Sequence, residues 1–293
     1  MERTNGPDGA GLPVELSDGR RRLRAFRVPV LLVVLFAAML VVVGIDTLVA
    51  PVPLLALPVG IGLAVAGVAF YRWLSRTVEV RDGVPEVAGE HRWSGLGRGA
   101  LLGFTLFCAV MTVILVFGGW DDLSWGSIGG FLGTAGMMFS VAIMEELLFR
   151  GVLFRVLEER TGTVISLVLS SLLFGATHLV NVNATAWGAL SIGLTGGLML
   201  ASAYVVTRSL WFPIGLHFAW NFTHAGLFGI IVSGSDEAPH GLLKATLSGP
   251  SALTGGTFGP EASLVALLVC AVPTVLLLRR AARTGRILPR PRR

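Results

Sequence analysis

Two adjacent glutamates and an arginine interrupt one apolar segment of the chain. Glu145, Glu146 and Arg150 lie in the run SIGGFLGTAGMMFSVAIMEELLFRGVLF, which is long enough to cross a bilayer. An ionisable side chain at the centre of such a segment costs about 2.5–3.5 kcal/mol on insertion scales, so it usually has a partner or a function. Glu146 and Arg150 are four residues apart on one helical face, which predicts a buried ion pair. Glu145 lies about 100° away around the helix and cannot share that pair equally, so one glutamate is structural and the other is free for chemistry. The structural alternative is that both glutamates cap the inner end of the helix and extend to water.

A later apolar segment carries a histidine that we expect to meet this carboxylate. His178 ends the sequence FGATH, which begins at Phe174. The chain turns near residues 161–162, and Glu145 and His178 lie about 16 residues to either side, so antiparallel helices place them at one depth. A carboxylate and an imidazole at one level suit general-base activation of water or shared metal ligation. The structural alternative is a histidine that hydrogen-bonds two helices together.

A further apolar segment contains the sequence GLHFAWNF. His217 and Asn221 are four residues apart on one helical face, and His224 continues the same face. A histidine and an amide side by side can donate hydrogen bonds to a developing oxyanion, or one can ligate a metal while the other orients it. A polar stripe that joins helices is the structural alternative here too.

The composition specifies the elements that must position these residues. Of the 293 residues, 53% are hydrophobic and 14% are charged, and the mean hydropathy is +0.75. Soluble domains carry about 25% charged residues, so the chain is a polytopic membrane protein. The fold class that we predict is all-α, a transmembrane helix bundle of about eight spans. These spans are 28–49, 54–74, 99–118, 128–157, 163–181, 185–207, 210–232 and 261–278. The sixth is rich in Gly, Ser and Ala and is expected at the centre of the bundle.

The basic residues predict the orientation of the bundle. Arginines flank every second connection between spans, whereas the other connections hold Asp121, Asp122, Asp236, Glu237 and the only lysine, Lys244. The positive-inside rule then places both termini in the cytoplasm. Residues 1–27 are expected to be a disordered basic tail, 28–282 the transmembrane domain and 283–293 a second basic tail. A signal peptide is the alternative for the N-terminus, but its apolar run exceeds the usual 7–15 residues.

Three further features are expected to carry no chemistry. The segment 233–260, rich in Gly, Ser and Pro, is predicted to be a loop. Asp46 lies near the outer end of the first span, where an exposed carboxylate costs little free energy. Cys108 and Cys270 fall within apolar spans and are expected to be small buried hydrophobes, with no disulfide framework. The arginines flank apolar spans and do not form one soluble basic face, so a nucleic-acid partner is not expected.

The three motifs together resemble the CPBP family of intramembrane proteases, also called the Abi family or the type II CAAX prenyl endopeptidases. The resemblance rests on EExxxR, FxxxH and HxxxN in this order on polytopic spans, and it covers roughly 129–229. It implies an endopeptidase whose active site lies inside the bilayer, in a cavity open to the cytosol.

The resemblance also implies a role for each motif residue. Glu145 and His178 would activate the attacking water, His217 and Asn221 would stabilise the oxyanion, and the predicted ion pair would hold them in place. The implied catalytic residues are Glu145, Glu146, Arg150, His178, His217 and Asn221.

The family resemblance leaves the use of a metal open. Its members are often described as metalloproteases with Zn²⁺ on glutamate and histidine side chains, and a metal-free glutamate mechanism has also been proposed. The tentative zinc ligands in this chain are Glu146, His178 and His217. The chain lacks HExxH, the helical zinc-protease motif. Glu, His and His from three helices could still form a catalytic zinc site, so the spacing does not decide between the two mechanisms.

The substrate that we expect is a peptide or protein in or at the membrane, with the lipid bilayer as the other partner. Nothing in the sequence indicates recognition of a prenyl group, and the preference for arginine over lysine indicates a GC-rich bacterial genome. The expected location is therefore a bacterial plasma membrane. Two other classes remain: a non-catalytic scaffold or bacteriocin-immunity-type protein that retains the motifs, and a transporter that relays protons through Glu and His. The absence of a visible inverted repeat weakens the transporter interpretation.

Overall fold

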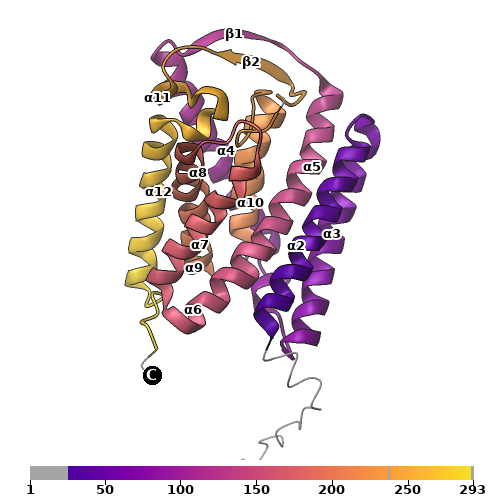
Figure 1. Ribbon diagram of the computed structural model, residues 1–293, viewed down its shortest axis with the longest axis vertical. Coiled ribbons are helices and arrows are strands. Elements are labelled where there is room, and N and C mark those ends of the chain that lie inside the picture. The colour runs from indigo at the N-terminus through magenta and orange to yellow at the C-terminus, as the bar shows by residue number, and fades with distance from the viewer. Residues whose placement is uncertain (1–25, 237, 292–293) are drawn as a thin grey trace, which may run out of the picture.

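A computed structural model of the chain describes residues 26–236 and 238–291. It is a bundle of helices with a short two-stranded sheet across one end (Figure 1). The elements of the first half are α2 (Arg27–Val49), α3 (Pro53–Val78), η1 (Pro85–Val87), α4 (Arg92–Val116), β1 (Trp120–Trp125), α5 (Ile128–Glu146), η2 (Leu147–Phe154) and α6 (Arg155–Thr161). The predicted all-α bundle is thereby confirmed.

The second half begins at the predicted turn, where Gly162 has a positive φ of 79°. Its longer elements are α7 (Thr163–Thr177), α8 (Ala186–Ile192), α9 (Leu198–Thr207), α10 (Trp211–Phe222), β2 (Leu243–Leu247) and α12 (Leu264–Arg283). Its shorter elements are η3 (His178–Val180), η4 (Gly193–Gly197), η5 (Thr223–Leu227), α11 (Ser251–Thr254), η6 (Gly256–Phe258) and η7 (Pro260–Ala262).

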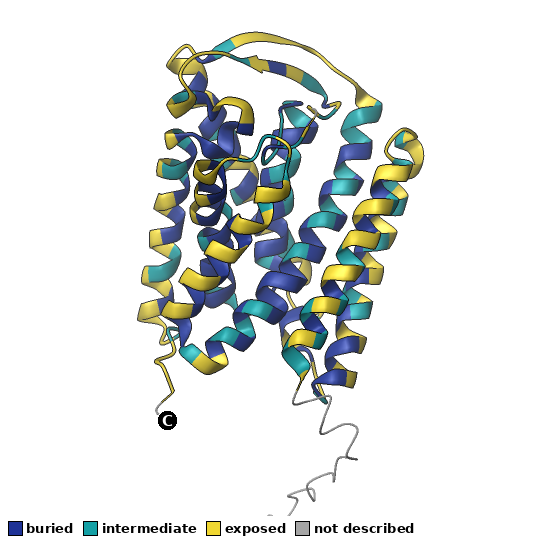
Figure 2. Ribbon diagram, in the orientation of Figure 1, coloured by how far each residue is buried: buried dark blue, intermediate teal, exposed yellow. Residues whose placement is uncertain are grey.

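Six helical stretches within the described residues are long and apolar enough to cross a membrane, with mean hydropathies from 1.7 to 3.1. The helices that contain 128–157 and 210–232 are not among them, so a count of eight crossings stays a prediction. The stretch Ala186–Thr207 is 72% buried, against 17–39% for the other five. Its predicted central position is confirmed. Figure 2 shows that α2, α3 and α12 expose one face outward, as lipid-facing helices do.

Glycines let the site-bearing helices approach their neighbours closely. A Cβ added to Gly99 of α4 would lie 2.1 Å from the carbonyl oxygen of Phe212, and one added to Gly103 would lie 2.3 Å from that of Leu216. Both contacts are with the backbone of α10, where no flexible side chain can move aside. Small residues at membrane helix interfaces allow this kind of backbone contact. It fixes the position of α10, and with it the position of His217.

One end of the bundle gathers ion pairs, and we call it the arginine end. Arg155 Nη2 lies 2.6 Å from Glu79 Oε2, and Arg81 binds both oxygens of Glu86 at 2.6 and 2.7 Å. The arginine end also includes the pairs Arg27–Glu159 and Arg208–Glu158. These pairs tie the start of α2, the end of α3, α6 and the end of α9 to one another.

Glu86 shows the electrostatic effect of this network. Burial alone would raise the pKa of its carboxyl group, but the hydrogen bonds from Arg81 and Tyr71, together with the Arg81 charge, outweigh burial and hold the pKa below its usual range. Burial alone would lower the pKa of Arg81, but its contacts with Glu86 outweigh this effect and raise it.

The C-terminal segment also joins the arginine end. The Arg286 carbonyl accepts a hydrogen bond from Arg208, and the backbone N–H of Leu288 donates to Thr163. The expected N-terminal tail lies, apart from Phe26 and Arg27, outside the described residues.

The opposite end carries the sheet, and we call it the strand end. β1 and β2 are antiparallel, with Trp120 opposite Leu247 and Trp125 opposite Leu243. In Figure 1 this sheet spans the top of the bundle, whereas α6 and the C-terminus lie at the bottom. The expectation that 233–260 is only a loop is wrong, because β2, α11 and η6 lie within it. A strand with its partner some 120 residues away leaves no local signal in the sequence.

Candidate active site

The predicted ion pair exists and is buried. Arg150 Nη1 lies 2.7 Å from Glu146 Oε1, and the two residues are 1% and 0% exposed. Two charges this deep in a bundle are tolerated only when they compensate each other and have further hydrogen-bond partners. The pair therefore serves as the fixed centre of the site.

Arg150 also connects three elements. Its Nη2 donates to the carbonyl oxygen of Gly197 at 2.9 Å and to that of Gly196 at 3.3 Å, both in η4. Its guanidinium carbon lies 4.7 Å from the centre of the Phe174 ring on α7, the geometry of a cation–π contact. These contacts of Phe174 and of the two glycine carbonyls were not predicted, because cross-helix contacts with backbone oxygens have no signature in residue type.

The described residues contain three π-helical segments, and each adjoins the site. η2 follows directly on Glu146, η4 supplies the carbonyls that bind Arg150, and η5 begins two residues after Asn221. π-helical turns are rare and occur frequently at functional sites, because the wider turn redirects side chains and alters which carbonyls are free. The concentration of these turns around the motif residues marks the region as specialised.

His217 contacts both glutamates. Its Nδ1 lies 2.9 Å from Glu146 Oε1, within hydrogen-bond distance, and its Nε2 lies 3.6 Å from Glu145 Oε2. The buried carboxylate of Glu146 therefore orients the imidazole through Nδ1, and Nε2 faces the carboxylate of Glu145. Glu145 differs from its neighbour, because its side chain is 18% exposed and lines a cavity.

His178 lies at the junction of α7 and η3. Its Nδ1 is 2.9 Å from the carbonyl oxygen of Phe174, one turn earlier. In the tautomer that donates this bond, Nε2 remains an acceptor. His178 lines the same cavity as Glu145, and a direct contact between the two residues stays a prediction. No hydrogen bond links His178 to either glutamate within the described residues.

Asn221 also lines the cavity, one turn beyond His217. His224 does not, although the spacing of seven predicted that it continues the face. It is fully buried, and its ring stacks on Phe107 at a centroid distance of 4.5 Å. His224 lies within the π-helical segment η5, where the angle per residue differs from that of an α-helix, so the regular α-helical count does not apply there.

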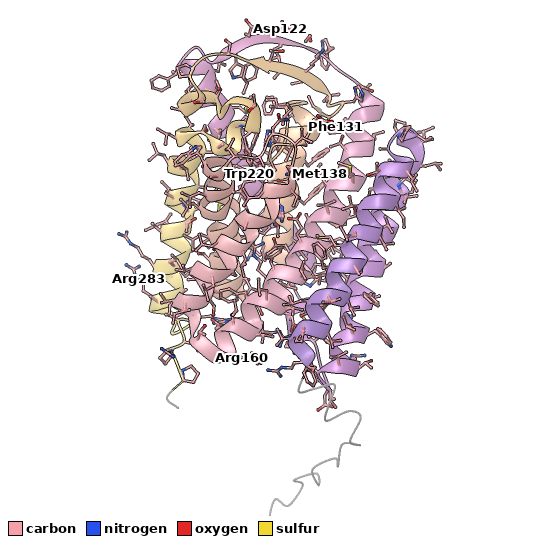
Figure 3. All side chains as sticks on the ribbon, in the orientation of Figure 1. Asp122, Phe131, Met138, Arg160, Trp220 and Arg283 are labelled. Carbon is pink, nitrogen blue, oxygen red and sulfur yellow. The ribbon has the colours of Figure 1, made fainter. Side chains whose placement is uncertain are left out.

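The cavity has a volume of about 1150 Å³ and ends at Glu145 on its inner side. Its wall on α5 runs from Gly130 to Glu145, and Met138 and Trp220, labelled in Figure 3, also line it. It reaches the surface at the strand end, where the exposed residues Asp236 and His240 border it. With the cavity open at the strand end, two expectations from the sequence conflict. The positive-inside rule puts the strand end outside, whereas the resemblance implied a cavity open to the cytosol.

Two acidic residues of the cavity were not recognised from the sequence. Asp46 was expected to be exposed, yet it is 2% exposed and accepts a hydrogen bond of 2.5 Å from Ser140 on α5. Its position in the apolar run VVVGIDTLV was a usable signal, because intramembrane carboxylates seldom lack a partner. Glu261, whose oxygens accept hydrogen bonds from Trp220 and Ser233, borders the cavity from the opposite wall.

The tentative zinc ligands do not fit the structure. Oε1 of Glu146 already accepts hydrogen bonds from Arg150 and His217, so a metal ion on it would lie against the arginine cation. Within the described residues, no group of three or more His, Cys, Asp or Glu side chains is placed to hold a metal ion. Structural and catalytic zinc sites need at least three such ligands.

The fold and the site together define a helical membrane protein with a carboxylate–imidazole centre inside a deep cavity. Residues 125–223 match the family model described as type II CAAX prenyl endopeptidase Rce1-like. The matched segment contains all six motif residues, and the resemblance to the CPBP family is thereby confirmed. No curated protein and no solved structure matches the chain significantly.

Proposed function

We propose that the protein is an intramembrane endopeptidase that hydrolyses a peptide bond of a membrane-associated polypeptide, with Glu145 as the general base. One observation carries the assignment: of two adjacent glutamates, Glu146 is locked by Arg150 and His217, while Glu145 faces the cavity. A base must reach the water that it deprotonates, and of the two glutamates only Glu145 meets this condition. The Rce1-like domain supports the same reaction class.

In the proposed reaction a water in the cavity attacks the carbonyl carbon of the peptide while its proton passes to the carboxylate of Glu145. His178, held through Nδ1, offers Nε2 as a second acceptor that orients this water. The tetrahedral intermediate collapses when Glu145 returns the proton to the amide nitrogen and the C–N bond breaks. The carboxylate of Glu145 therefore serves first as base and then as acid. The proton that it takes from water goes to the leaving amine, so Glu145 ends the reaction ionised as it began.

The oxyanion of the intermediate needs hydrogen-bond donors, and we assign them to His217 and Asn221. This role requires His217 to carry both protons: Nδ1–H donates to Glu146, and Nε2–H points toward Glu145 and the cavity. The four charged groups then sum to zero, because two carboxylates face one guanidinium and one imidazolium. The Asn221 side chain lines the cavity one turn away and makes no hydrogen bond with the described residues, so its NH₂ group is available.

The reaction class is tested by cleavage in H₂¹⁸O. Purified protein in lipid vesicles is given a mixture of single-span polypeptides, and the products are weighed by mass spectrometry. Hydrolysis places one heavy oxygen in the new carboxyl group. Asn221→Ala is expected to lower the rate about 10²–10³-fold, the usual effect of losing one oxyanion donor. Glu90→Gln, which changes an exposed glutamate far from the cavity, serves as the matched control.

Two results would contradict the proposal. Products without ¹⁸O would mean that the bond is broken by another reaction. An absence of product from the wild-type protein across the whole mixture would favour the non-catalytic scaffold that retains the motifs.

A further inference from the structure

The cavity occupies only the half of the bundle toward the strand end. On three helices its lining residues lie toward that end: from Phe36 onward on α2, from Pro53 to Ala56 on α3, and from Phe174 onward on α7. On α5 the lining runs down to Glu145 and ends there. Its lining includes none of the residues that form the ion pairs of the arginine end. A polypeptide can therefore approach Glu145 only from the strand end or from the side.

The side approach lies between α2 and the end of α7. The apolar residues Phe36, Leu40 and Val180 line the cavity, and they are 44%, 55% and 86% exposed. Apolar side chains that face both a cavity and the lipid form an opening for an apolar segment that is already in the membrane. Both approaches lie in the same half of the molecule.

Charge separates the two halves. Every described arginine except Arg150 lies at or near the arginine end: Arg27, Arg72, Arg76, Arg81, Arg92, Arg98, Arg155, Arg160, Arg208, Arg279, Arg280, Arg283, Arg286 and Arg290. The cavity lining contains four carboxylates and, within the described residues, no lysine or arginine. These carboxylates belong to Asp46, Glu145, Asp236 and Glu261.

We propose that the active site takes its substrate from the non-cytoplasmic side of the membrane, as an apolar or cationic polypeptide segment presented at the outer face. The positive-inside rule assigns the arginine end to the cytoplasm, so the cavity mouth faces outward. Of the four lining carboxylates only Glu145 lies beside a lining cation, the imidazolium of His217, so the lining as a whole is negative and repels acidic side chains. The substrate class rests on the proposed protease function, whereas the direction of access does not.

Thiol labelling in whole cells tests the direction of access without any need for activity. Cys108 is replaced by alanine, and Cys270 is kept because it is 1% exposed. Single cysteines then replace Asp122 at the strand end or Arg160 at the arginine end, both exposed and labelled in Figure 3. A third variant, His240→Cys, reports on the cavity mouth itself. A membrane-impermeant maleimide is applied before and after the cells are permeabilised.

The expected result is that Asp122→Cys and His240→Cys react in intact cells, while Arg160→Cys reacts only after permeabilisation. The reverse pattern, or equal labelling of all three in intact cells, would overturn the proposal while leaving the protease function untouched.

The charge preference is tested on the purified enzyme with two substrates that differ only in flanking residues, lysine in one and glutamate in the other. We expect the lysine form to be cleaved at least tenfold faster. Equal rates, or a faster glutamate form, would overturn the substrate class. Neither outcome depends on the labelling result.

Discussion

The ion pair between Glu146 and Arg150 makes a sharp prediction for stability. Replacing Arg150 by methionine keeps most of the side-chain volume but leaves the carboxylate of Glu146 buried at 0% exposure without its cation. Removing one partner of a buried pair typically costs about 3–5 kcal/mol. Since about 1.4 kcal/mol is a factor of ten, the unfolding equilibrium should shift by about 10²- to 10⁴-fold.

A double-mutant cycle separates the pair from the other contacts of each residue. Arg150→Met, Glu146→Gln and the double variant are unfolded in mixed micelles by titration with SDS, and helicity gives the free energy of unfolding. The double variant should lose less than the sum of the single variants, because it leaves no uncompensated charge. Arg27→Met is the matched control. It breaks an ion pair with Glu159, whose side chain is 42% exposed, and surface pairs contribute about 0–1 kcal/mol.

The stabilising role of the pair is refuted if Arg150→Met is no less stable than Arg27→Met. It is equally refuted if the two single effects add in the double variant. Either result would mean that the 2.7 Å contact does not stabilise the core of the site.

Contacts outside that pair, and the ligand chemistry of the site, give three more expected outcomes. Because Arg81 and Tyr71 hold the pKa of Glu86 below its usual range, this carboxylate stabilises the fold fully above its unfolded pKa of about 4.3 and progressively less as pH falls through the folded value. Glu86→Gln should therefore flatten the acid side of a stability–pH curve, and an unchanged curve would contradict the assignment. Phe174→Leu removes the ring beneath Arg150 and should destabilise the protein by about 2 kcal/mol, measured by the same SDS titration; a loss within error of zero would argue against the cation–π contact. Chelation followed by metal analysis should leave the cleavage rate unchanged, since the described residues offer no ligand set, and activity restored only by added zinc would show that this expectation is wrong.

Local spacing predicted the parts of the site that lie on one regular helix. The i,i+4 relation of Glu146 and Arg150 holds because side chains four apart share a helical face. The same relation brings His217 and Asn221 to one cavity wall. The turn at Gly162 was also predictable, because the chain had to reverse between two apolar segments.

Depth was predicted less well. Counted from the turns beside them at a rise of about 1.5 Å per residue, His217 would lie some 10 Å shallower than Glu145. The structure brings His217 Nε2 to 3.6 Å from Glu145 Oε2. The π-helical segments and the irregular end of α7 break the constant rise on which such counting depends. A π-helical turn cannot be predicted from the local sequence, because contacts between helices cause it.

The contribution of the segment 233–240 was also missed. Most of its described residues border the cavity, and Ser233 donates to Glu261, so the segment forms part of the rim of the site at the strand end. Composition rich in Gly, Ser and Pro indicates a connection between spans but says nothing about the surface on which it packs. Asp46 was misjudged for a related reason, since its partner Ser140 belongs to a helix that begins 82 residues later in the chain.

The proposed function depends on Glu145, and not Glu146, performing the chemistry. The decisive measurement is the single-turnover cleavage rate of Glu145→Gln, with enzyme in excess over a bound polypeptide and with unfolding followed on the same sample. We expect a rate lower by about 10²–10⁴-fold with wild-type stability and intact substrate binding. A rate equal to that of the wild type would contradict the assignment of the base.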